Sequence, residues 1–425
     1  MVNLCFSLLL IGLFLVTMFR KDSNLFSFCL TLLILFHDLL FVSLKDEVSV
    51  FYYYSIKCWQ EILTIFGFVR LLISKKKLGW PVFFILSLAI HGLFVGIIQG
   101  TNFFEIFRGF RMYLLFICGL FLLFYSDYFK RINLRLIFTV FIGFTTFSAL
   151  YSVWVDYLYM GDLKVLWFYN FVNQINPIES ARFNYVRDGG LRACGLLISP
   201  LIQSLLLGFS TLILTLLTFK NPERRNPAWN FILLTIQIIG LILCRTRIGW
   251  FVVGGGLVLA FAHLYCHRLS LYQSYLVPIV LVLMTLFILL FGYTTDPSAL
   301  GRIPQYKLLF LNFNWVGLGF GHPSTLTVFD SMYISAGLTF GVLGLLYIMI
   351  PVMACAILHD QRKNYLDHTK PDSFYFAASY GFSFILLYVF AFQFTLGSPT
   401  VLLFYFLVYS FSVESKFRVH SKPNE

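Results

Sequence analysis

Charged residues are scarce in this chain of 425 residues, where Asp, Glu, Lys and Arg together make up 12% and hydrophobic residues make up 59%. So small a share of charge is too little to cover the surface of a water-soluble globule. The mean hydropathy of +0.83 agrees with this. The composition therefore excludes a soluble globular protein and indicates that a lipid bilayer surrounds most of the chain.

Metal-binding patterns, repeats and soluble segments are also lacking. The eight cysteines include no Cys-x-x-Cys pair and no spacing typical of metal ligands, so we expect them to be packing residues. We find no internal repeat, no low-complexity tail and no soluble domain. The sequence accordingly predicts one membrane domain over residues 1–425, with no metal and no other cofactor.

Long apolar segments fill much of the chain, and several approach the roughly 20 residues that a membrane helix needs. They do not alternate with period two, as the strands of a membrane barrel would. Because lipid offers the backbone no hydrogen-bond partners, such segments fit helices. The prediction is an all-α polytopic membrane protein with about twelve or thirteen spans. Clear examples are Leu4–Phe19, Pro81–Ile98, Leu136–Met160, Leu196–Phe219, Val277–Phe291 and Met332–Leu358. The first has no basic region before it and no cleavage site after it, so we expect a retained helix.

The formal net charge of +12 comes from Lys and Arg gathered in turns between the apolar segments. This is the positive-inside pattern of membrane topology, which we prefer to nucleic-acid binding. If the turn 75–77 is cytoplasmic, the basic turns near 130–135, 220–225, 267–268, 362–363 and 416–418 fall on the same side. The opposite, periplasmic side receives the turns 99–110 and 245–247 and two long loops, 159–191 and 294–330. Long ordered loops usually carry function.

Several arginines fall on this outer side, against the topology rule, and therefore need a second reason. A guanidinium near the membrane boundary costs up to a few kcal/mol unless it snorkels or finds a partner. Its fork also matches phosphate oxygens in a bidentate way. We predict a diphosphate-binding site formed by Arg192, Arg245, Arg247 and Arg302, with Arg187 in the substrate loop beside it. Snorkelling, or ion pairs with Asp156, Asp162, Glu179 or Asp188, would explain each arginine singly.

Short motifs follow one another in a distinctive order in the second half of the chain. They are Gly301-Arg302, Gly317-x-Gly319-x-Gly321, Asp330-Ser331-x-Tyr333 and Gly337-Leu338-x-x-Gly341. Before them come Arg192-x-x-Gly195 with Ser199-Pro200, and the tight turn Arg245-Thr-Arg-x-Gly249. In this order, the motifs between residues 185 and 350 resemble those of the O-antigen polymerase and ligase superfamily, the Wzy and WaaL type.

The resemblance implies a metal-independent glycosyltransferase in the bacterial inner membrane, acting on its outer face with undecaprenyl-diphosphate-linked glycans as donors. It implies that the arginines hold the diphosphate and that apolar helices hold the lipid tail. Gly317, Gly319 and Gly321 would let backbone N–H groups approach the diphosphate. Electrostatic stabilisation of that leaving group is the main catalytic demand.

A general base for the attacking sugar hydroxyl is the other demand of such a reaction. Asp330 stands where the ligases of the superfamily carry histidine, which favours a polymerase of repeat units and makes Asp330 the candidate base. His322 is the second candidate, and Tyr333 would stack on a sugar face. The alternatives are that Asp330 only caps a helix, that His322 is an ordinary loop residue, and that the aromatic residue belongs to an interfacial belt.

Polymerisation of lipid-linked repeat units into O-antigen or a related surface polysaccharide is thus the expected function. Ligation of the glycan to lipid A core and flipping of the same lipid-linked oligosaccharide are the alternatives. A flippase would show charged residues along an alternating-access cavity and internal repeats, whereas the polar residues here gather in two outer loops. Expected partners are the lipid-linked glycan, membrane lipid, a chain-length-regulating co-polymerase and a flippase, but not nucleic acid.

Overall fold

The computed structural model describes residues 2–37, 39, 42, 58–74, 80–129, 131–175, 182–187, 189–220, 227–265, 279–280, 282–284, 303–323, 331–344, 346–347, 381, 385 and 399–419. These residues are mostly helical. The strands found among them, β1 (Val186–Arg187) and β2 (Gly190–Leu191), pair antiparallel in one short hairpin. The predicted helical fold is therefore confirmed for the described part of the chain.

Three helical stretches among the described residues are long and apolar enough to cross a membrane, namely Phe103–Tyr125, Leu134–Leu158 and Pro200–Thr218. Shorter apolar helices accompany them, such as Phe83–Ile98 and Ala228–Leu243. These helices fit a membrane protein. The count of about twelve or thirteen spans stays a prediction, because the expected spans near 277–291 and 332–358 are described only in part.

The chain divides into two compact units, and each unit is assembled from separate stretches of sequence. Unit 1 comprises Met1–Cys58, Ile132–His267 and Arg362–Gly381. Unit 2 comprises Trp59–Arg131, Arg268–Gln361 and Phe382–Glu425. The chain thus passes from one unit to the other several times, and the expectation of a single membrane domain stays a prediction.

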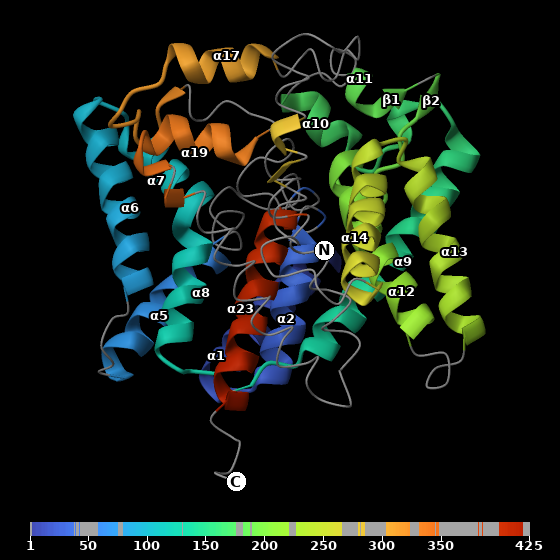
Figure 1. Ribbon diagram of the computed structural model, residues 1–425, viewed down its shortest axis with the longest axis horizontal. Helices are drawn as coiled ribbons and strands as arrows, with labels where there is room; N and C mark the ends of the chain where they lie inside the picture. Colours follow the sequence, from blue (N-terminus) through green and yellow to red (C-terminus); the bar gives the residue numbers. More distant parts are fainter. Residues whose placement is uncertain are drawn as a thin grey trace. The chain divides into compact units, whose positions relative to one another are not determined.

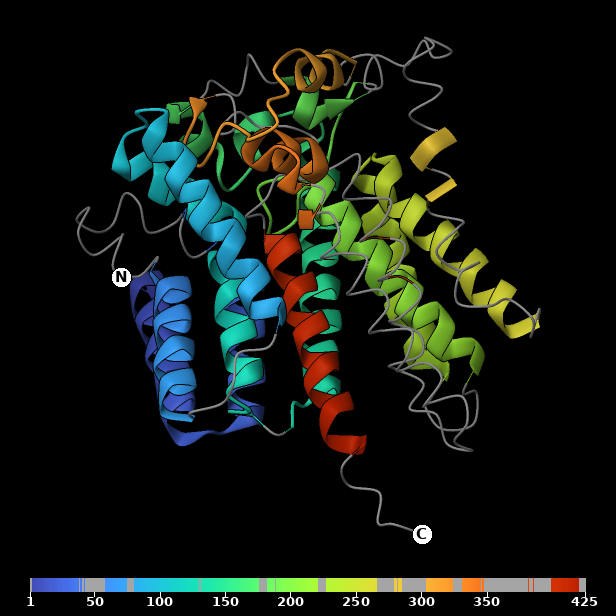
Figure 2. The same ribbon diagram turned by 60° about the vertical axis from the view of Figure 1, so that its left-hand side comes forward.

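Unit 1 is built around α9 (Leu134–Tyr159), the longest helix that it shows. Helices α2 (Ser23–Leu35), α12 (Pro200–Lys220) and α13 (Pro227–Leu243) pack against α9, and α14 (Arg247–Tyr265) packs against α12; α1 (Val2–Arg20) pairs with α2 (Figure 1). The connection from α9 to α12 carries η2 (Leu163–Val165), α10 (Tyr169–Ile175), α11 (Arg182–Tyr185) and the β1–β2 hairpin. These short elements lie at one end of the helices, as both ribbon views show (Figures 1 and 2).

Small residues let the helices of unit 1 approach closely. A Cβ atom on Gly249 of α14 would collide with the carbonyl oxygen of Ser204 in α12. The Gly249 N–H donates to the Ser204 hydroxyl at 3.1 Å. A Cβ on Gly240 of α13 would lie 2.7 Å from the Cβ of Ala149 in α9. Close backbone approach of this kind supplies much of the packing energy between helices in lipid.

Hydroxyl and amide groups join the same helices through buried hydrogen bonds. The Gln237 side chain of α13 donates to Thr145 at 3.2 Å and to Thr146 at 3.0 Å, both in α9. Thr145 in turn donates to Ser210 of α12 at 3.0 Å. These bonds fix α9, α12 and α13 against one another, and so fix the loop end that they carry.

Unit 2 contains α5 (Trp59–Ser74), α6 (Trp80–Ile98), α7 (Phe103–Phe110), α8 (Phe116–Tyr125), α17 (Ile303–Leu311), α19 (Met332–Phe340) and α23 (Pro399–Val419). A π-helical turn, η1 (Arg111–Leu115), joins α7 to α8 within one apolar stretch. Phe340 packs at the centre of the unit, with ring centroids 5.5 Å from Phe320, 5.7 Å from Tyr113 and 5.6 Å from Tyr347. This aromatic core holds the loop 317–321 against the helices.

Candidate functional site

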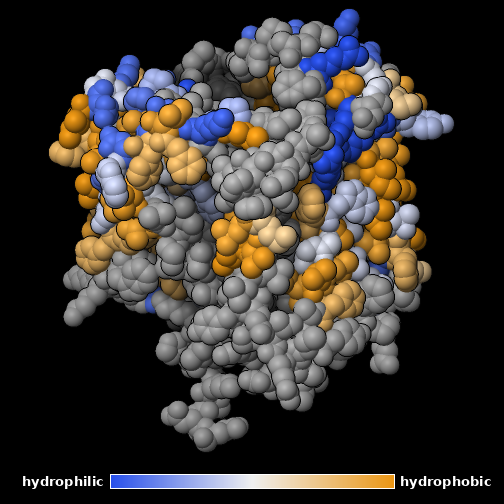
Figure 3. Space-filling view, turned by 45° about the horizontal axis from the view of Figure 1, so that its top comes forward, coloured by the Kyte–Doolittle hydropathy of each residue, from blue (hydrophilic) through white to orange (hydrophobic). Residues whose placement is uncertain are grey.

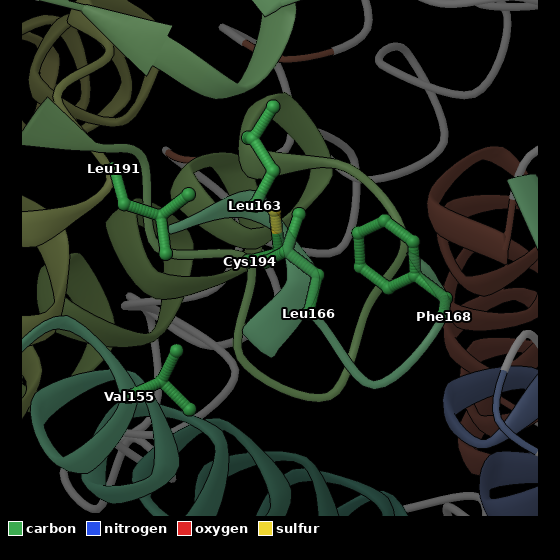
Figure 4. Packing of buried hydrophobic residues seen from close by; sticks show 6 residues of the cluster. All are labelled: Val155, Leu163, Leu166, Phe168, Leu191 and Cys194. Carbon is green, nitrogen blue, oxygen red and sulfur yellow. The ribbon is translucent and has the colours of Figure 1, made fainter. Parts of the chain in front are cut away.

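A small apolar core orders the connection between α9 and α12. Trp167 Nε1 donates to the carbonyl oxygen of Gly195 at 3.1 Å, and the Ala193 N–H donates to the carbonyl oxygen of Leu243 at 3.0 Å. The described part of the first long loop is therefore a folded structure fixed to the ends of α9 and α13. The buried members of the core, shown in Figure 4, are Val155, Leu163, Leu166, Phe168, Leu191 and Cys194.

Arg245 ties this connection to the turn between α13 and α14. Its backbone has φ of +50°, which is uncommon for a residue other than glycine. Its Nη1 donates to the carbonyl oxygen of Arg187 at 2.9 Å, and its Nη2 lies 3.9 Å from Met160 Sδ. The guanidinium lies directly against Gly190, where a Cβ would displace it. The structure thus brings together two of the predicted arginines, Arg187 and Arg245.

Arg192 is nearly buried, with 8% of its surface exposed. Its backbone N–H donates to the carbonyl oxygen of Tyr185 at 2.7 Å, which extends the β1–β2 hairpin. Burial lowers the pKa of the Arg192 guanidinium; the nearby Cys194 acts in the opposite direction, and the charge of Arg187 lowers the pKa further. Arginine stays protonated even so. Two cations that repel each other favour an anion between them.

Arg247 is the first residue of α14 and is exposed. It follows Arg245 by two positions, so the turn carries both guanidinium groups at the end of unit 1 where the hairpin lies. Figure 3 shows hydrophilic residues in blue near this end and hydrophobic residues in orange along the helices. The four predicted arginines that fall in unit 1 therefore share one end of it, while their contact with a diphosphate stays a prediction.

One buried carboxylate lies in the same region. Asp156 of α9 is 5% exposed, and its Oδ1 has no hydrogen-bond partner. Arg245 acts on it electrostatically. Asp162 instead caps η2 by accepting the Lys164 N–H at 2.9 Å. Among the described residues, neither aspartate forms an ion pair with Arg245, whose guanidinium bonds the carbonyl oxygen of Arg187.

Neutral groups complete the surroundings of the arginines. Burial raises the pKa of Tyr185 to about 12, and the nearby Cys194 adds to the effect. Burial likewise raises the pKa of the Cys194 and Cys244 thiols. Both thiols are free and buried, as a packing role predicts. Near neutral pH these three groups are uncharged, so they add no charge to that of the arginines and Asp156.

The glycine motif of the second long loop lies in unit 2. Gly317, Gly319 and Gly321 have φ of +87°, +73° and +80°, which L side chains rarely adopt. A Cβ would meet the backbone of α19 at Gly317, of α6 at Gly319 and of α7 at Gly321. The loop therefore passes so close to three helices that only glycine fits at these positions.

The N–H groups of this loop are largely bonded within the protein. Gly317 donates to the carbonyl oxygen of Asn314 and Gly319 to that of Thr339, both at 3.0 Å. Phe320 donates to the carbonyl oxygen of Gly92 at 2.9 Å. Packing thus accounts for the glycines, and their contact with a substrate stays a prediction.

The predicted catalytic residues of the second loop are described only in part. His322 and Tyr333 are partly exposed, and Tyr333 lies in the first turn of α19. Ser331 is the N-cap of α19, since its Oγ accepts the Ile334 N–H at 3.3 Å. The N-cap position of this helix is thus taken by Ser331, the residue after Asp330. Asp330 and Arg302 lie outside the described residues, and their roles stay predictions.

An ion pair in unit 2 was not anticipated from the sequence. Glu61 Oε1 of α5 lies 3.0 Å from Arg111 Nε, and the two side chains are 15% and 21% exposed. Arg111 opens the π-helical turn η1, and Thr64 of α5 donates to the carbonyl oxygen of Leu115 at its end at 2.9 Å. The sequence signal was one charged residue inside each of the two apolar segments. No spacing rule predicts that residues so far apart in the chain form an ion pair.

Among the described residues, no three His, Cys, Asp or Glu side chains gather as ligands for a metal ion. In comparisons with known proteins, no protein-family model matches this chain, and no curated protein matches it. Any assignment of function therefore depends on the chemistry of these side chains and on the motif order.

Proposed function

We propose that this protein polymerises lipid-linked oligosaccharide repeat units into O-antigen or a related surface polysaccharide. The donor is a glycan on undecaprenyl diphosphate, and transfer takes place on the outer face of a bacterial inner membrane that the chain crosses about twelve or thirteen times. The supporting observation is the gathering of Arg187, Arg192, Arg245 and Arg247 at the folded loop end of unit 1.

Electrostatics connects this arginine cluster to the proposed reaction. When a glycan leaves its carrier, negative charge develops on the diphosphate oxygen, and fixed cations lower the energy of that state. The buried Arg192 is held by the hairpin, and Arg247 is exposed at the start of α14. Guanidinium groups bind phosphate oxygens through two hydrogen bonds at once. A site with several guanidinium groups therefore suits a diphosphate ligand better than it suits a ligand with a single carboxylate.

The motif order supports a polymerase over a ligase. Asp330-Ser331 stands where ligases of the resembling superfamily carry histidine. Asp330 or His322 is the base that the motif order predicts, and Arg302 is a predicted ligand of the diphosphate. Gly317, Gly319 and Gly321 hold the second loop against its helices. A flippase would instead place charged residues along a transport cavity.

Complementation of a strain that lacks this protein tests the proposal. We expect Arg187→Ala, Arg192→Lys and Arg247→Ala to reduce the polysaccharide ladder to a single-repeat band, because loss of one fixed donor costs roughly 10²- to 10³-fold in rate. Arg108→Ala is the matched control, since Arg108 of α7 is exposed and paired with Glu105 at 3.5 Å. Membrane levels of every variant are measured alongside.

The ladder distinguishes the alternatives. A full ladder in all three site variants would remove the arginine cluster from the reaction and contradict the proposal. Loss of even the single-repeat band would indicate ligation or flipping instead. Loss of the ladder in Arg108→Ala as well would show that any outer arginine matters, and would leave the cluster without a special role.

A further inference from the structure

Asp156 is a buried carboxylate that the diphosphate site does not use. It is 5% exposed, and its Oδ1 has no hydrogen-bond partner. Ser148 and Ser152 of the same helix are bonded, since the Ser148 hydroxyl donates to the Gln203 side chain at 2.8 Å and the Ser152 hydroxyl donates to the Ser148 carbonyl oxygen at 3.0 Å. Burial of an acceptor without a donor is unfavourable. The unsatisfied oxygen therefore points to a donor that comes from a ligand.

The charges around Asp156 are those of the proposed diphosphate site. Arg245 acts on its carboxylate electrostatically, and the guanidinium of Arg245 reaches Met160 directly beyond the end of α9. Asp156 and Arg192 both act on the Cys244 thiol. The carboxylate and the arginines are thus within electrostatic reach of one another at one end of unit 1.

Two turn glycines leave space beyond this end of α9. No heavy atom lies within 4 Å of the position that a Cβ would take on Gly189. At Gly161 the nearest atom is the carbonyl oxygen of Gly189, at 3.9 Å. Both glycines have positive φ, at +86° for Gly161 and +75° for Gly189, so larger side chains are disfavoured there. The turn that follows α9 is therefore open at these two positions.

We propose that Asp156, in place of Asp330 or His322, takes up the proton of the attacking sugar hydroxyl; this inference rests on the proposed function. The hydroxyl oxygen forms a bond to the anomeric carbon of the donor glycan. The bond from that carbon to the diphosphate oxygen breaks, and its electron pair stays on the diphosphate. The proton passes to the Asp156 carboxylate, while Arg187, Arg192 and Arg247 hold the charge of the departing undecaprenyl diphosphate. Unit 1 then supplies both the base and the cations of the transfer.

The test uses the full chain, purified in detergent, with lipid-linked repeat units extracted from the source strain. Asp156→Asn keeps the size of the side chain but removes its basicity. We expect transfer per folded molecule to fall by about 10²- to 10⁴-fold, while the affinity for undecaprenyl diphosphate, used as the probe, changes by less than about threefold. Asp162→Asn is the matched control, because Asp162 is exposed and caps η2.

The outcomes separate this inference from the proposed function. Normal transfer by Asp156→Asn together with loss of transfer by Arg247→Ala overturns the inference alone. Normal transfer by both variants overturns the proposed function as well. Parallel loss of transfer and of probe binding in Asp156→Asn also overturns the inference, since Asp156 would then support the arginines. The inference is also overturned if neither Asp156→Asn nor Asp156→Glu can be purified in folded form.

Discussion

Arg245 combines a strained backbone with a side chain fixed at several points. A left-handed conformation costs a non-glycine residue about 1 to 2 kcal/mol. The hydrogen bond to Arg187 and the contact with Gly190 offset that cost. Substitution of Arg245 would therefore disturb both the loop and the charge of the site. Arg247, which is exposed at the start of α14, is the more informative position for testing the charge of the site.

Ser331 allows a test of the helix cap in unit 2. We expect Ser331→Ala to lower the free energy of unfolding by about 1 kcal/mol, because the Ile334 N–H loses its acceptor. The measurement is denaturant unfolding in detergent. Ser87→Ala is the control, since Ser87 bonds only the Phe83 carbonyl oxygen within α6 and is exposed. Equal stability of the two variants would contradict the assignment of Ser331 as the cap.

At the scale of helices, Gly249 and Gly254 make a matched pair on α14. A Cβ on Gly249 would collide with the backbone carbonyl oxygen of Ser204 in α12, whereas a Cβ on Gly254 would meet no atom within 4 Å. We expect Gly249→Ala to cost about 1 to 3 kcal/mol through overpacking. Gly254→Ala is expected to be neutral or to stabilise by up to about 1 kcal/mol through helix propensity.

Thermal unfolding of the two purified variants in the same detergent measures the difference. A Gly249→Ala variant as stable as Gly254→Ala would mean that α12 and α14 do not need close approach. Gly249 belongs to the motif Arg245-Thr-Arg-x-Gly249, so the same experiment separates its packing role from any role toward a substrate.

The sequence predicted the elements better than the contacts between them. Apolar runs were enough to predict the helices that contain Leu134–Leu158 and Pro200–Thr218. The motif glycines were also found from the sequence, but as substrate residues, because a Gly-x-Gly-x-Gly pattern does not reveal which backbones it passes. Asp156 entered only as an ion-pair partner, since its burial and missing donor depend on how the loop folds over α9. Tertiary packing decides such features.

At the scale of the whole molecule, the basic turns predict which ends of the helices face the cytoplasm. We expect alkaline phosphatase fused before Pro200 to be active and the same enzyme fused after Lys220 to be inactive, because α12 would run from the periplasm to a basic cytoplasmic turn. A fluorescent protein that folds only in the cytoplasm should show the reverse pattern at the same two junctions.

Phosphatase activity after Lys220 would invert the predicted topology and move the arginine cluster to the cytoplasmic side. Activity at both junctions would mean that α12 does not cross the membrane. Either result would contradict transfer on the outer face, whereas the expected pattern would leave the arginines on the periplasmic side.

The interleaved make-up of the two units bears on biogenesis. Unit 1 begins with Met1–Cys58 and is completed only by Arg362–Gly381, where Gly381 reaches Phe209 and Leu212 of α12. During synthesis the early helices of unit 1 therefore enter the membrane before its last segment, Arg362–Gly381, has been translated. Nascent chains that stop short of residue 381 lack the last piece of this unit, so premature termination should yield species that membrane proteases remove.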